Sequence, residues 1–514
     1  METINLTIEE LQKKFEEGAL TSVQAVENCY KRIDAVNPKT KSFLEIRKEK
    51  ALKAAQESDK KIKSKTGGAL EGVPIAIKDN LMIRGEIMSS ASKYLEHYTA
   101  PYDAAVIEKL KKAGAIFLGR TNMDEFAMGG STQTSAFAKT ANPWDLERIP
   151  GGSSGGSASA VGAAMAPCAL GSDTGGSIRQ PAGFCGVVGY KPSYGLISRY
   201  GVCALASSFD QVGTFSRSVK DTAKIVSVIS GKDYRDPVCQ PNEYIDYALG
   251  LDGADILKNT TIGIPKQLNE YEIDKEISDS FKDAIDRIKK LNAKIVEVDI
   301  SAYKYVPALY KVIMCAEVSA NIATFDGIRY GYRSPNGISL NDEYSKTRAE
   351  SLGYEVKKRI LFGTYVLGAK NYYRCYHQAQ RVRTLLINQI TDAYKKCDII
   401  FTPSSLQMPV KFGENLREES DIFLMAANLA GLPGITVPCS MSDKNIPMGV
   451  HFLGARLKDA QLFKVAAAYE AISGFDNNKM PVYSNRSCNN CQPCRHCALP
   501  MVSSLKFPNI FKKK

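Results

Sequence analysis

Two segments rich in glycine and serine carry residue types that can perform acyl transfer. Residues 151–157 read GGSSGGS, and residues 171–181 read GSDTGGSIRQP. In the second segment, the adjacent glycines Gly175 and Gly176 allow consecutive backbone N–H groups to point at one spot, as an oxyanion hole requires. Ser177 follows them directly. The pattern indicates a serine nucleophile beside preorganised backbone donors.

A serine nucleophile needs a base, and histidine is scarce in this chain. It has four histidines, none of them in a Gly/Ser-rich segment, and His451 lies in an apolar run typical of a buried strand. A buried lysine is the alternative base, because desolvation lowers its pKa towards neutrality. Lys78 ends the apolar run 73–77. The residues alone leave open whether Lys78 is that base or an ion-pair partner at the end of a strand.

The composition of 151–157 also fits other interpretations. It is typical of a flexible linker, but apolar sequence resumes at 167–170. Gly151-x-Ser153-x-Gly155 matches a nucleophile elbow, yet that motif follows a hydrophobic strand and here WDLERIP precedes it. No phosphate-binding G-x-x-x-x-G-K-[ST] motif occurs.

Taken together, residues 151–195 resemble the signature of the amidase-signature hydrolases, which use a Ser–cis-Ser–Lys triad. The resemblance implies that Ser177 is the acylated nucleophile and that Ser153, after a cis peptide bond, relays protons. It implies that Lys78 is the base. It also implies an oxyanion hole formed by backbone N–H groups of Thr174, Gly175, Gly176 and Ser177.

Further segments resemble one subgroup of that family, the glutamine-hydrolysing A subunits of amidotransferases that convert Glu-tRNA(Gln) to Gln-tRNA(Gln). They lie at 118–137, 206–223, 316–333, 358–369 and 421–438, so the resemblance runs from residue 1 to about 484. It implies B and C partner subunits, a misacylated tRNA bound through the complex, ATP and Mg²⁺ in a partner subunit, no cofactor in this chain, and a cytoplasmic location. Whether the acceptor is Glu-tRNA(Gln), Asp-tRNA(Asn) or both stays open. A stand-alone amidase acting on small carboxamides is the alternative.

A glutamine pocket needs a carboxylate for the substrate's ammonium group and an arginine for its carboxylate. The resemblance assigns these roles to Asp421 and Arg359, and it places Met128 and Tyr310 along the side-chain slot. Arg359 is adjacent to Lys358, which leaves a shift of one residue open.

The elements around these residues alternate between strands and helices. Short apolar runs predict strands at 73–77, 115–118, 261–264, 294–298, 398–401, 434–437 and 450–453, and helices include 275–291, 302–324, 354–396 and 459–473. The alternation predicts an α/β fold: a single large domain over 1–484 with a central mixed, mostly parallel sheet covered by helices on both faces. Within it we expect a helical N-terminal layer at 1–65 and a signature core at 70–225.

The net charge and the hydropathy of the sequence bear on three further classes: nucleic-acid-binding, membrane-spanning and secreted proteins. The 514 residues include 67 Lys and Arg against 55 Asp and Glu, a net charge of +12. Half of it, +6, lies in residues 485–514, and the other +6 is spread along Lys-rich helices of residues 1–484, so the net charge does not establish a nucleic-acid site. No apolar run reaches the roughly 18–20 residues of a membrane-spanning helix, and residues 1–18 lack the pattern of a secretory signal.

A basic, Cys-rich tail is expected at 485–514, where six Lys and Arg occur without an acidic residue. Cys488, Cys491, Cys494 and Cys497 are spaced three apart, which fits a zinc or iron–sulfur site. Free thiols in an unstructured tail are the alternative. A nucleic-acid- or metal-binding protein built on this tail is the remaining function class.

Overall fold

The computed structural model describes residues 5–240, 245–251, 253 and 255–483. The chain separates into two compact units, Met1–Met480 and Pro481–Lys514. All of the helices and strands below belong to the first unit. Cys488, Cys491, Cys494 and Cys497 lie outside the described residues, so the metal site in the tail stays a prediction.

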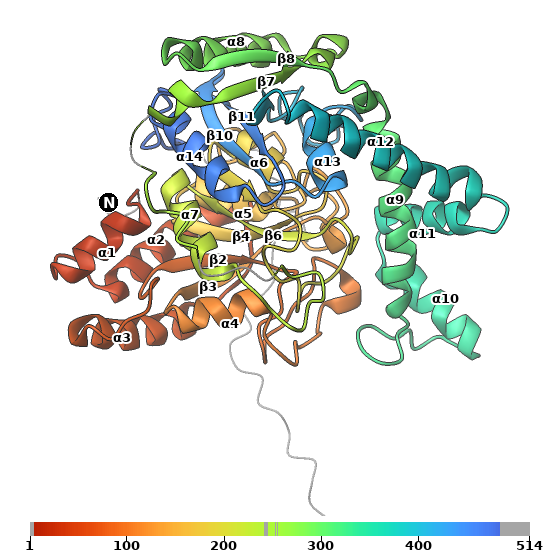
Figure 1. The fold of residues 1–514 in the computed structure, drawn as a ribbon. Helices are drawn as coiled ribbons and strands as arrows, with labels where there is room; N and C mark the ends of the chain where they lie inside the picture. The colour runs from red at the N-terminus through yellow and green to blue at the C-terminus, as the bar shows by residue number, and fades with distance from the viewer. Residues whose placement is uncertain (1–4, 241–244, 252, 254, 484–514) are drawn as a thin grey trace, which may run out of the picture. The chain divides into compact units, whose positions relative to one another are not determined.

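One sheet contains 11 strands. They are β1 (Phe43–Ile46), β2 (Pro74–Lys78), β3 (Ile116–Thr121), β4 (Cys168–Asp173), β5 (Val188–Lys191), β6 (Gln211–Ser216), β7 (Thr261–Pro265), β8 (Lys294–Val298), β9 (Ile399–Pro403), β10 (Gly434–Met441) and β11 (Pro447–Gly454). Their order in the sheet is β1-β3-β2-β4-β6-β5-β10-β11-β9-β7-β8 (Figure 1). Each strand predicted from an apolar run is present within a few residues of its expected bounds.

The sheet is mixed, as predicted, but antiparallel pairs outnumber parallel ones. Parallel pairs join β2 to β3 and β4, and β7 to β8 and β9. The other six pairs are antiparallel. Three of these six involve β5 and β6, whose sequences VGYK and QVGTFS mix glycine and polar residues with apolar ones. Such short segments lack the continuous apolar run by which a buried strand is recognised.

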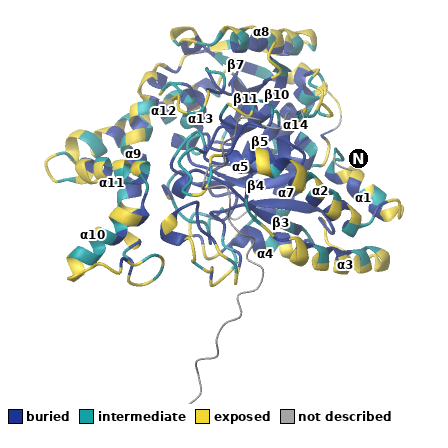
Figure 2. Ribbon diagram, turned by 180° about the vertical axis from the view of Figure 1, so that it is seen from behind, coloured by how far each residue is buried: buried dark blue, intermediate teal, exposed yellow. Residues whose placement is uncertain are grey.

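Helices cover both faces of the sheet. They are α1 (Ile8–Glu16), α2 (Ser22–Thr40), α3 (Lys48–Ser64), α4 (Ala105–Lys112), α5 (Gly155–Gly162), α6 (Arg179–Cys185), α7 (Val219–Ile229), α8 (Lys275–Lys290), α9 (Val306–Asn321), α10 (Leu340–Ser351), α11 (Tyr354–Leu367), α12 (Gln378–Ala393), α13 (Ile422–Leu429) and α14 (Asp459–Glu470). Every residue of β4 and β6 is buried, which requires cover on both sides because successive side chains point to opposite faces (Figure 2). α5 and α6 pack together, and between them they contact β4, β5, β6, β10 and β11. α7 and α14 also pack together and contact β5, β6, β10 and β11.

The predicted helical N-terminal layer is present, with β1 inserted between its helices. Capping boxes begin α1 at Thr7 and α2 at Thr21, where each threonine accepts from the backbone three residues on. The N–H of Ile8 donates to Oδ1 of Asp221 at 2.9 Å, which ties the start of α1 to α7.

The helix predicted over 354–396 is in fact divided. α11 ends at Leu367, Gly368 adopts an extended conformation, and a π-helical turn at Tyr373–His377 leads into α12. Glycine stabilises a helix poorly, so the break falls at Gly368. Among the described helices, one stretch, Ser301–Thr324, is long and apolar enough to cross a membrane. Its main part, α9, packs against α11, α12 and α13, as a helix of a globular core does.

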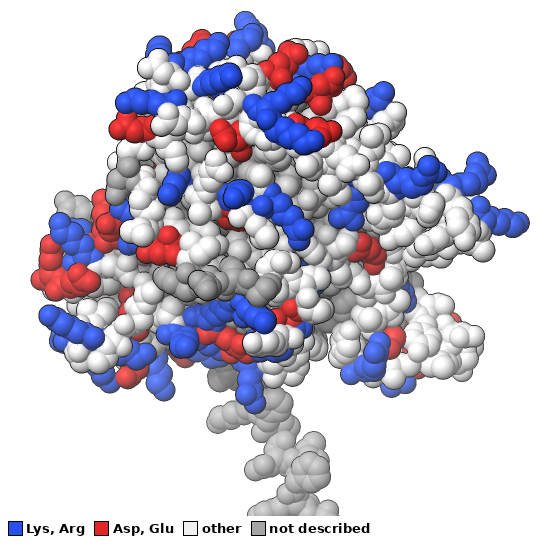
Figure 3. Space-filling model, in the orientation of Figure 1, with Lys and Arg blue, Asp and Glu red and all other residues white. Residues whose placement is uncertain are grey.

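Acidic and basic side chains are interspersed over most of the face shown in Figure 3. This agrees with the expectation that the charges of residues 1–484 are spread along solvated helix faces.

Candidate active site

Lys78 is the last residue of β2, beside the parallel strand β4, so the carboxyl ends of both strands meet at one edge. Its side chain is fully buried and is surrounded by hydroxyl groups. Nζ lies 2.9 Å from Ser153 Oγ, 2.7 Å from Ser154 Oγ and 2.9 Å from Ser172 Oγ. No carboxylate forms an ion pair with it among the described residues. The ion-pair interpretation of Lys78 is therefore wrong.

Burial lowers the pKa of Lys78 to about 7, against the weaker opposing effect of the charges of Asp124, Asp173 and Asp210. A lysine with this pKa is neutral in a large fraction of molecules at physiological pH, and a neutral amine can accept a proton.

The loop 151–155 is held from several sides. The peptide bond between Gly152 and Ser153 is cis. Thr132 Oγ1 donates to Gly151 O at 2.9 Å and accepts from the N–H of Gly155 at 3.1 Å. The N–H of Gly152 donates to Gln180 Oε1 at 3.0 Å. The segment that resembles a linker by composition is thus a buried, fully packed turn.

Ser177 lies between β4 and α6 and is 8% exposed. The N–H of Ser154 donates to Ser177 O at 3.2 Å, which places the two loops side by side. The structure brings Lys78 and Ser153 into hydrogen-bond contact. It does not show a hydrogen bond between the hydroxyls of Ser153 and Ser177, although both residues are described.

The oxyanion hole implied by the resemblance loses one donor in this structure. The N–H of Gly176 donates to Asp173 Oδ1 at 2.8 Å, and the N–H of Ile178 donates to Asp173 Oδ2 at 3.1 Å. Asp173 thus holds the backbone on both sides of Ser177. The remaining backbone donors of this turn are those of Thr174, Gly175 and Ser177.

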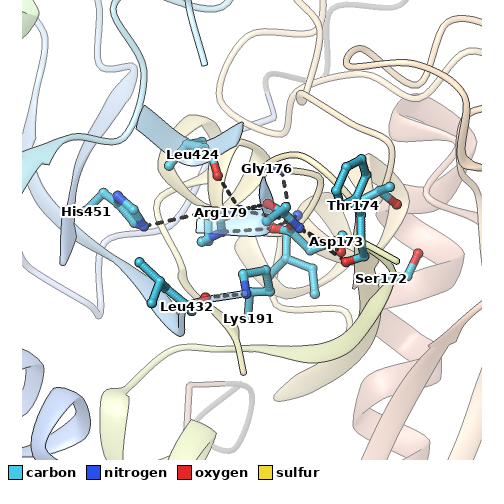
Figure 4. A network of polar contacts seen from close by, with 12 residues as sticks. Ser172, Asp173, Thr174, Gly176, Arg179, Lys191, Leu424, Leu432 and His451 are labelled. Atoms are coloured by element: carbon cyan, nitrogen blue, oxygen red, sulfur yellow. Dashed lines mark hydrogen bonds and ion pairs between the residues drawn. The ribbon is translucent and has the colours of Figure 1, made fainter. Parts of the chain in front are cut away.

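Asp173 is itself held by a buried ion pair (Figure 4). Arg179 Nη2 lies 2.9 Å from Asp173 Oδ1, and both side chains are fully buried. Burial raises the pKa of Asp173, but the charge and hydrogen bonds of Arg179 outweigh it and hold the pKa below its ordinary value. Asn428 Nδ2 donates to Asp173 Oδ1 at 3.0 Å, and Asn428 Oδ1 accepts from Arg179 at 2.6 Å. His451 is buried in β11 near Arg179, in the core position expected for it.

Three of the predicted pocket residues line one cavity of about 540 Å³: Tyr310, Arg359 and Asp421. The cavity adjoins the nucleophile turn, because a Cβ on Gly175 would lie 2.5 Å from Cζ of Tyr310. Asp421 begins α13; burial raises its pKa to about 7, and its Oδ1 is buried without a hydrogen-bond partner. That oxygen is free to accept from a ligand.

Arg359 is better placed for a ligand than its neighbour in sequence. Its side chain is 16% exposed and its Nε donates to Glu355 at 2.9 Å, whereas Lys358 is 53% exposed. Met128 is fully buried in the apolar core and is not among the residues that line the cavity. Its predicted contact with the substrate side chain has no support in the geometry.

Sequence reasoning missed several residues of this site. Ser172 accepts from both Lys78 and Asn80 Nδ2, the latter at 2.9 Å. Ser154 contacts Lys78 directly. Gln180 joins the loop 151–155 to Asp421. Only its place in the signature segment, three residues after Ser177, could have indicated Gln180.

In the part of the chain that the structure describes, no group of three or more His, Cys, Asp or Glu side chains is arranged to hold a metal ion. The expectation that this chain binds no cofactor stays a prediction.

Comparison with known proteins agrees with this geometry. The sequence model of the family "Amidase" matches residues 24–463. A protein of Endomicrobium trichonymphae, named as the A subunit of glutamyl-tRNA(Gln) amidotransferase, is 68% identical, over 93% of this chain and 99% of that protein. A protein of the same name from Carboxydothermus hydrogenoformans is 46% identical, over 92% and 99%.

Solved structures show the same fold. The crystal structure of the A subunit of glutamyl-tRNA(Gln) amidotransferase from Thermotoga maritima has a TM-score of 0.77 at 37% identity, over 93% of this chain and 97% of that one. A peptide amidase from Stenotrophomonas maltophilia has a TM-score of 0.76 at 28% identity, over 90% and 96%. With the lysine, the cis peptide and the two serine loops in place, and a family match across most of its length, the chain belongs to the amidase family.

Proposed function

We propose that this chain is the glutamine-hydrolysing subunit of a tRNA-dependent amidotransferase. The observation that carries the proposal is the contact between a buried lysine of near-neutral pKa, Lys78, and Ser153, beside the turn that bears Ser177. The names of the relatives supply the substrate class. A cavity with Arg359 and Asp421 fits the charged head of glutamine.

The hydrogen bonds around Lys78 indicate that the hydroxyl of Ser153 is the one that gives its proton to Lys78. The hydroxyl of Ser154 donates to Ser172 O at 3.0 Å, so Ser154 accepts from Lys78. A neutral amine has two N–H donors and one lone pair. If the donors serve Ser154 and Ser172, the lone pair remains for the proton of Ser153.

In the proposed reaction, Lys78 takes the proton of Ser153 as Ser153 takes the proton of Ser177, and Ser177 Oγ forms a bond to the amide carbon. N–H groups of Thr174, Gly175 and Ser177 stabilise the oxyanion. The relay then returns a proton to the leaving nitrogen, the C–N bond breaks, and ammonia departs. A water molecule hydrolyses the ester by the same route, which releases glutamate and restores Ser177.

The names of the relatives imply a multi-subunit enzyme. We infer that this chain acts with B and C subunits, that a misacylated tRNA binds through the complex, and that ATP and Mg²⁺ bind to a partner subunit, where ammonia is used. A cytoplasmic location follows from this role and stays a prediction.

The test uses the chain co-purified with its partner subunits. Glutamate release from glutamine is measured with and without ATP and charged tRNA, for wild type and Ser177→Ala. We expect Ser177→Ala to lose glutamate release while its melting temperature stays unchanged. Glutamate release that persists in the variant contradicts the assignment of the nucleophile. Full wild-type activity on simple carboxamides without any partner favours the stand-alone amidase.

A further inference from the structure

Gln180 connects the relay loop to the carboxylate of the substrate pocket. Its Oε1 accepts from the N–H of Gly152 at 3.0 Å, and its Nε2 donates to Asp421 Oδ2 at 2.8 Å. Gly152 is joined by the cis peptide bond to Ser153. The fully buried side-chain amide of Gln180 therefore connects the loop that contains Ser153 with Asp421, which faces the cavity.

The orientation of this amide follows from its neighbours. The N–H of Gly152 can only donate, so it requires the oxygen of Gln180, and the carboxylate of Asp421 requires the NH₂ group. The NH₂ group of Gln180 thus donates to Oδ2 of Asp421. Oδ1 of Asp421 is buried and has no hydrogen-bond partner, so it can accept from a ligand. Burial favours the neutral acid and raises the pKa of Asp421. A hydrogen bond from Ser420, the charge of Arg179 and the hydrogen bond that Gln180 donates to Oδ2 oppose this and favour the ionised form that an ammonium group needs.

We propose that Gln180 is a positioning residue that determines specificity for the α-ammonium group of the substrate, by holding Asp421 ionised and oriented in fixed register with the Ser153 loop. The inference rests on the proposed function, because it takes glutamine as the substrate and Asp421 as its ammonium contact. Gln180 touches neither the substrate nor the reacting atoms in this role.

The test compares two substrates that differ only at the group in question. Glutamine and glutaramate share the carboxamide and the carboxylate, but glutaramate lacks the α-ammonium group. Ammonia release from each is measured with the complex of this chain and its partner subunits. The readout is the ratio of the two kcat/KM values, because a general weakening of the site lowers both values and leaves the ratio unchanged.

Gln180→Met removes both hydrogen bonds at similar volume, and Gln180→Leu is a second variant of this kind. We expect the ratio of glutamine to glutaramate to fall by about 10- to 100-fold, the usual effect of one hydrogen bond to a charged group, mainly through the KM for glutamine. Thr132→Val is the matched control. Thr132 holds the same loop through Gly151 and Gly155 and does not contact Asp421, so its ratio should stay at the wild-type value.

The inference is overturned if the Gln180 variants lose activity on both substrates equally, or if Thr132→Val lowers the ratio as much as they do. Asp421→Asn separates this failure from failure of the proposed function. If Asp421→Asn lowers the ratio and the Gln180 variants do not, the glutamine pocket stands and Gln180 has no part in specificity. If Asp421→Asn leaves the ratio unchanged, the assignment of the pocket itself fails.

Discussion

Lys78 and Lys191 are both fully buried lysines whose pKa burial lowers to about 7, yet only Lys78 is surrounded by hydroxyl groups. Lys191 ends β5 and donates to the backbone carbonyls of Pro192 and Leu432. A carbonyl oxygen has no proton to give, whereas a serine hydroxyl has one. The two lysines therefore share a lowered pKa and differ in the chemistry that their hydrogen-bond partners allow.

Replacement of each lysine by methionine tests this difference. Lys78→Met should lower kcat by about 10²–10⁴-fold, the usual contribution of a general base, with little change in glutamine binding. Lys191→Met removes only hydrogen bonds to carbonyls, so it should retain most of the activity and lower the melting temperature. Steady-state kinetics and thermal unfolding of both variants measure this. Equal loss of kcat in the two variants would contradict the assigned base.

The pH dependence of the reaction should report the same lysine. Since the pKa of Lys78 is lowered to about 7, the base is protonated below this pH and neutral above it. We expect kcat/KM to rise with pH through a midpoint near 7 and to change about tenfold per unit on the acidic side. The substrate for this measurement is glutaramate, which lacks the ammonium group that Asp421 binds. With glutamine, the titration of Asp421, whose pKa is also about 7, would contribute to the profile. A profile that is flat from pH 5.5 to 8 argues against a lysine base.

The ion pair between Asp173 and Arg179 should dominate the stability of the nucleophile turn. Asp173→Asn leaves the fully buried Arg179 without its counter-charge, and breaking such a pair costs about 3–5 kcal/mol of unfolding free energy. Urea unfolding of purified variant and wild type gives this difference. Asp145→Asn is a control, since Asp145 pairs with Arg148 at a partly exposed site and should cost less than about 1 kcal/mol. Similar losses in the two variants would show that the buried pair has no special role.

A pair of buried carboxyl groups should make the fold less stable at alkaline pH. Burial raises the pKa of Asp221 to about 7 and that of Glu470 to about 8. Each folded-state value lies above that of the unfolded chain, so the folded state holds more protons between about pH 4 and these values. Stability is complete below about pH 4 and is lost as the pH rises through this window.

Asp221→Asn should therefore reduce this dependence, while its amide oxygen still accepts from Ile8. With these pKa values, wild type should lose about 5 kcal/mol of unfolding free energy between pH 5.5 and 8, and the variant should lose about 2 kcal/mol less. Urea unfolding at the two pH values measures it. An unchanged loss in Asp221→Asn would mean that Asp221 is already ionised at pH 5.5.

The sequence predicted the elements that carry continuous patterns. The apolar run 73–77 identified β2 and the position of Lys78 at its end, and the helical N-terminal layer predicted at 1–65 is present as α1, α2 and α3. The resemblance to the amidase signature selected Ser153 and Ser177. The structure places Ser153 in contact with Lys78, and the carbonyl of Ser177 accepts from the N–H of Ser154. Their catalytic roles stay predictions.

What the sequence did not reveal depends on contacts between distant segments. Gln180 and Asp421 are 241 residues apart, and no local pattern marks their hydrogen bond. The N–H of Gly176 has the residue type of an oxyanion donor but donates to Asp173. Met128 was expected at the substrate slot, yet the core around it buries it completely. In each case, the tertiary packing determines which neighbour the side chain or the backbone N–H group contacts.

The glycines of the loop 151–156 bear on how this gene tolerates change. A Cβ on Gly151 would lie 2.7 Å from Gln180 Oε1, and one on Gly152 would lie 2.6 Å from the backbone nitrogen of Ser131. Any amino-acid replacement reached by one base change in a glycine codon introduces a Cβ. Under random mutagenesis, the segment that most resembles a permissive linker should be among the least variable in the surviving clones.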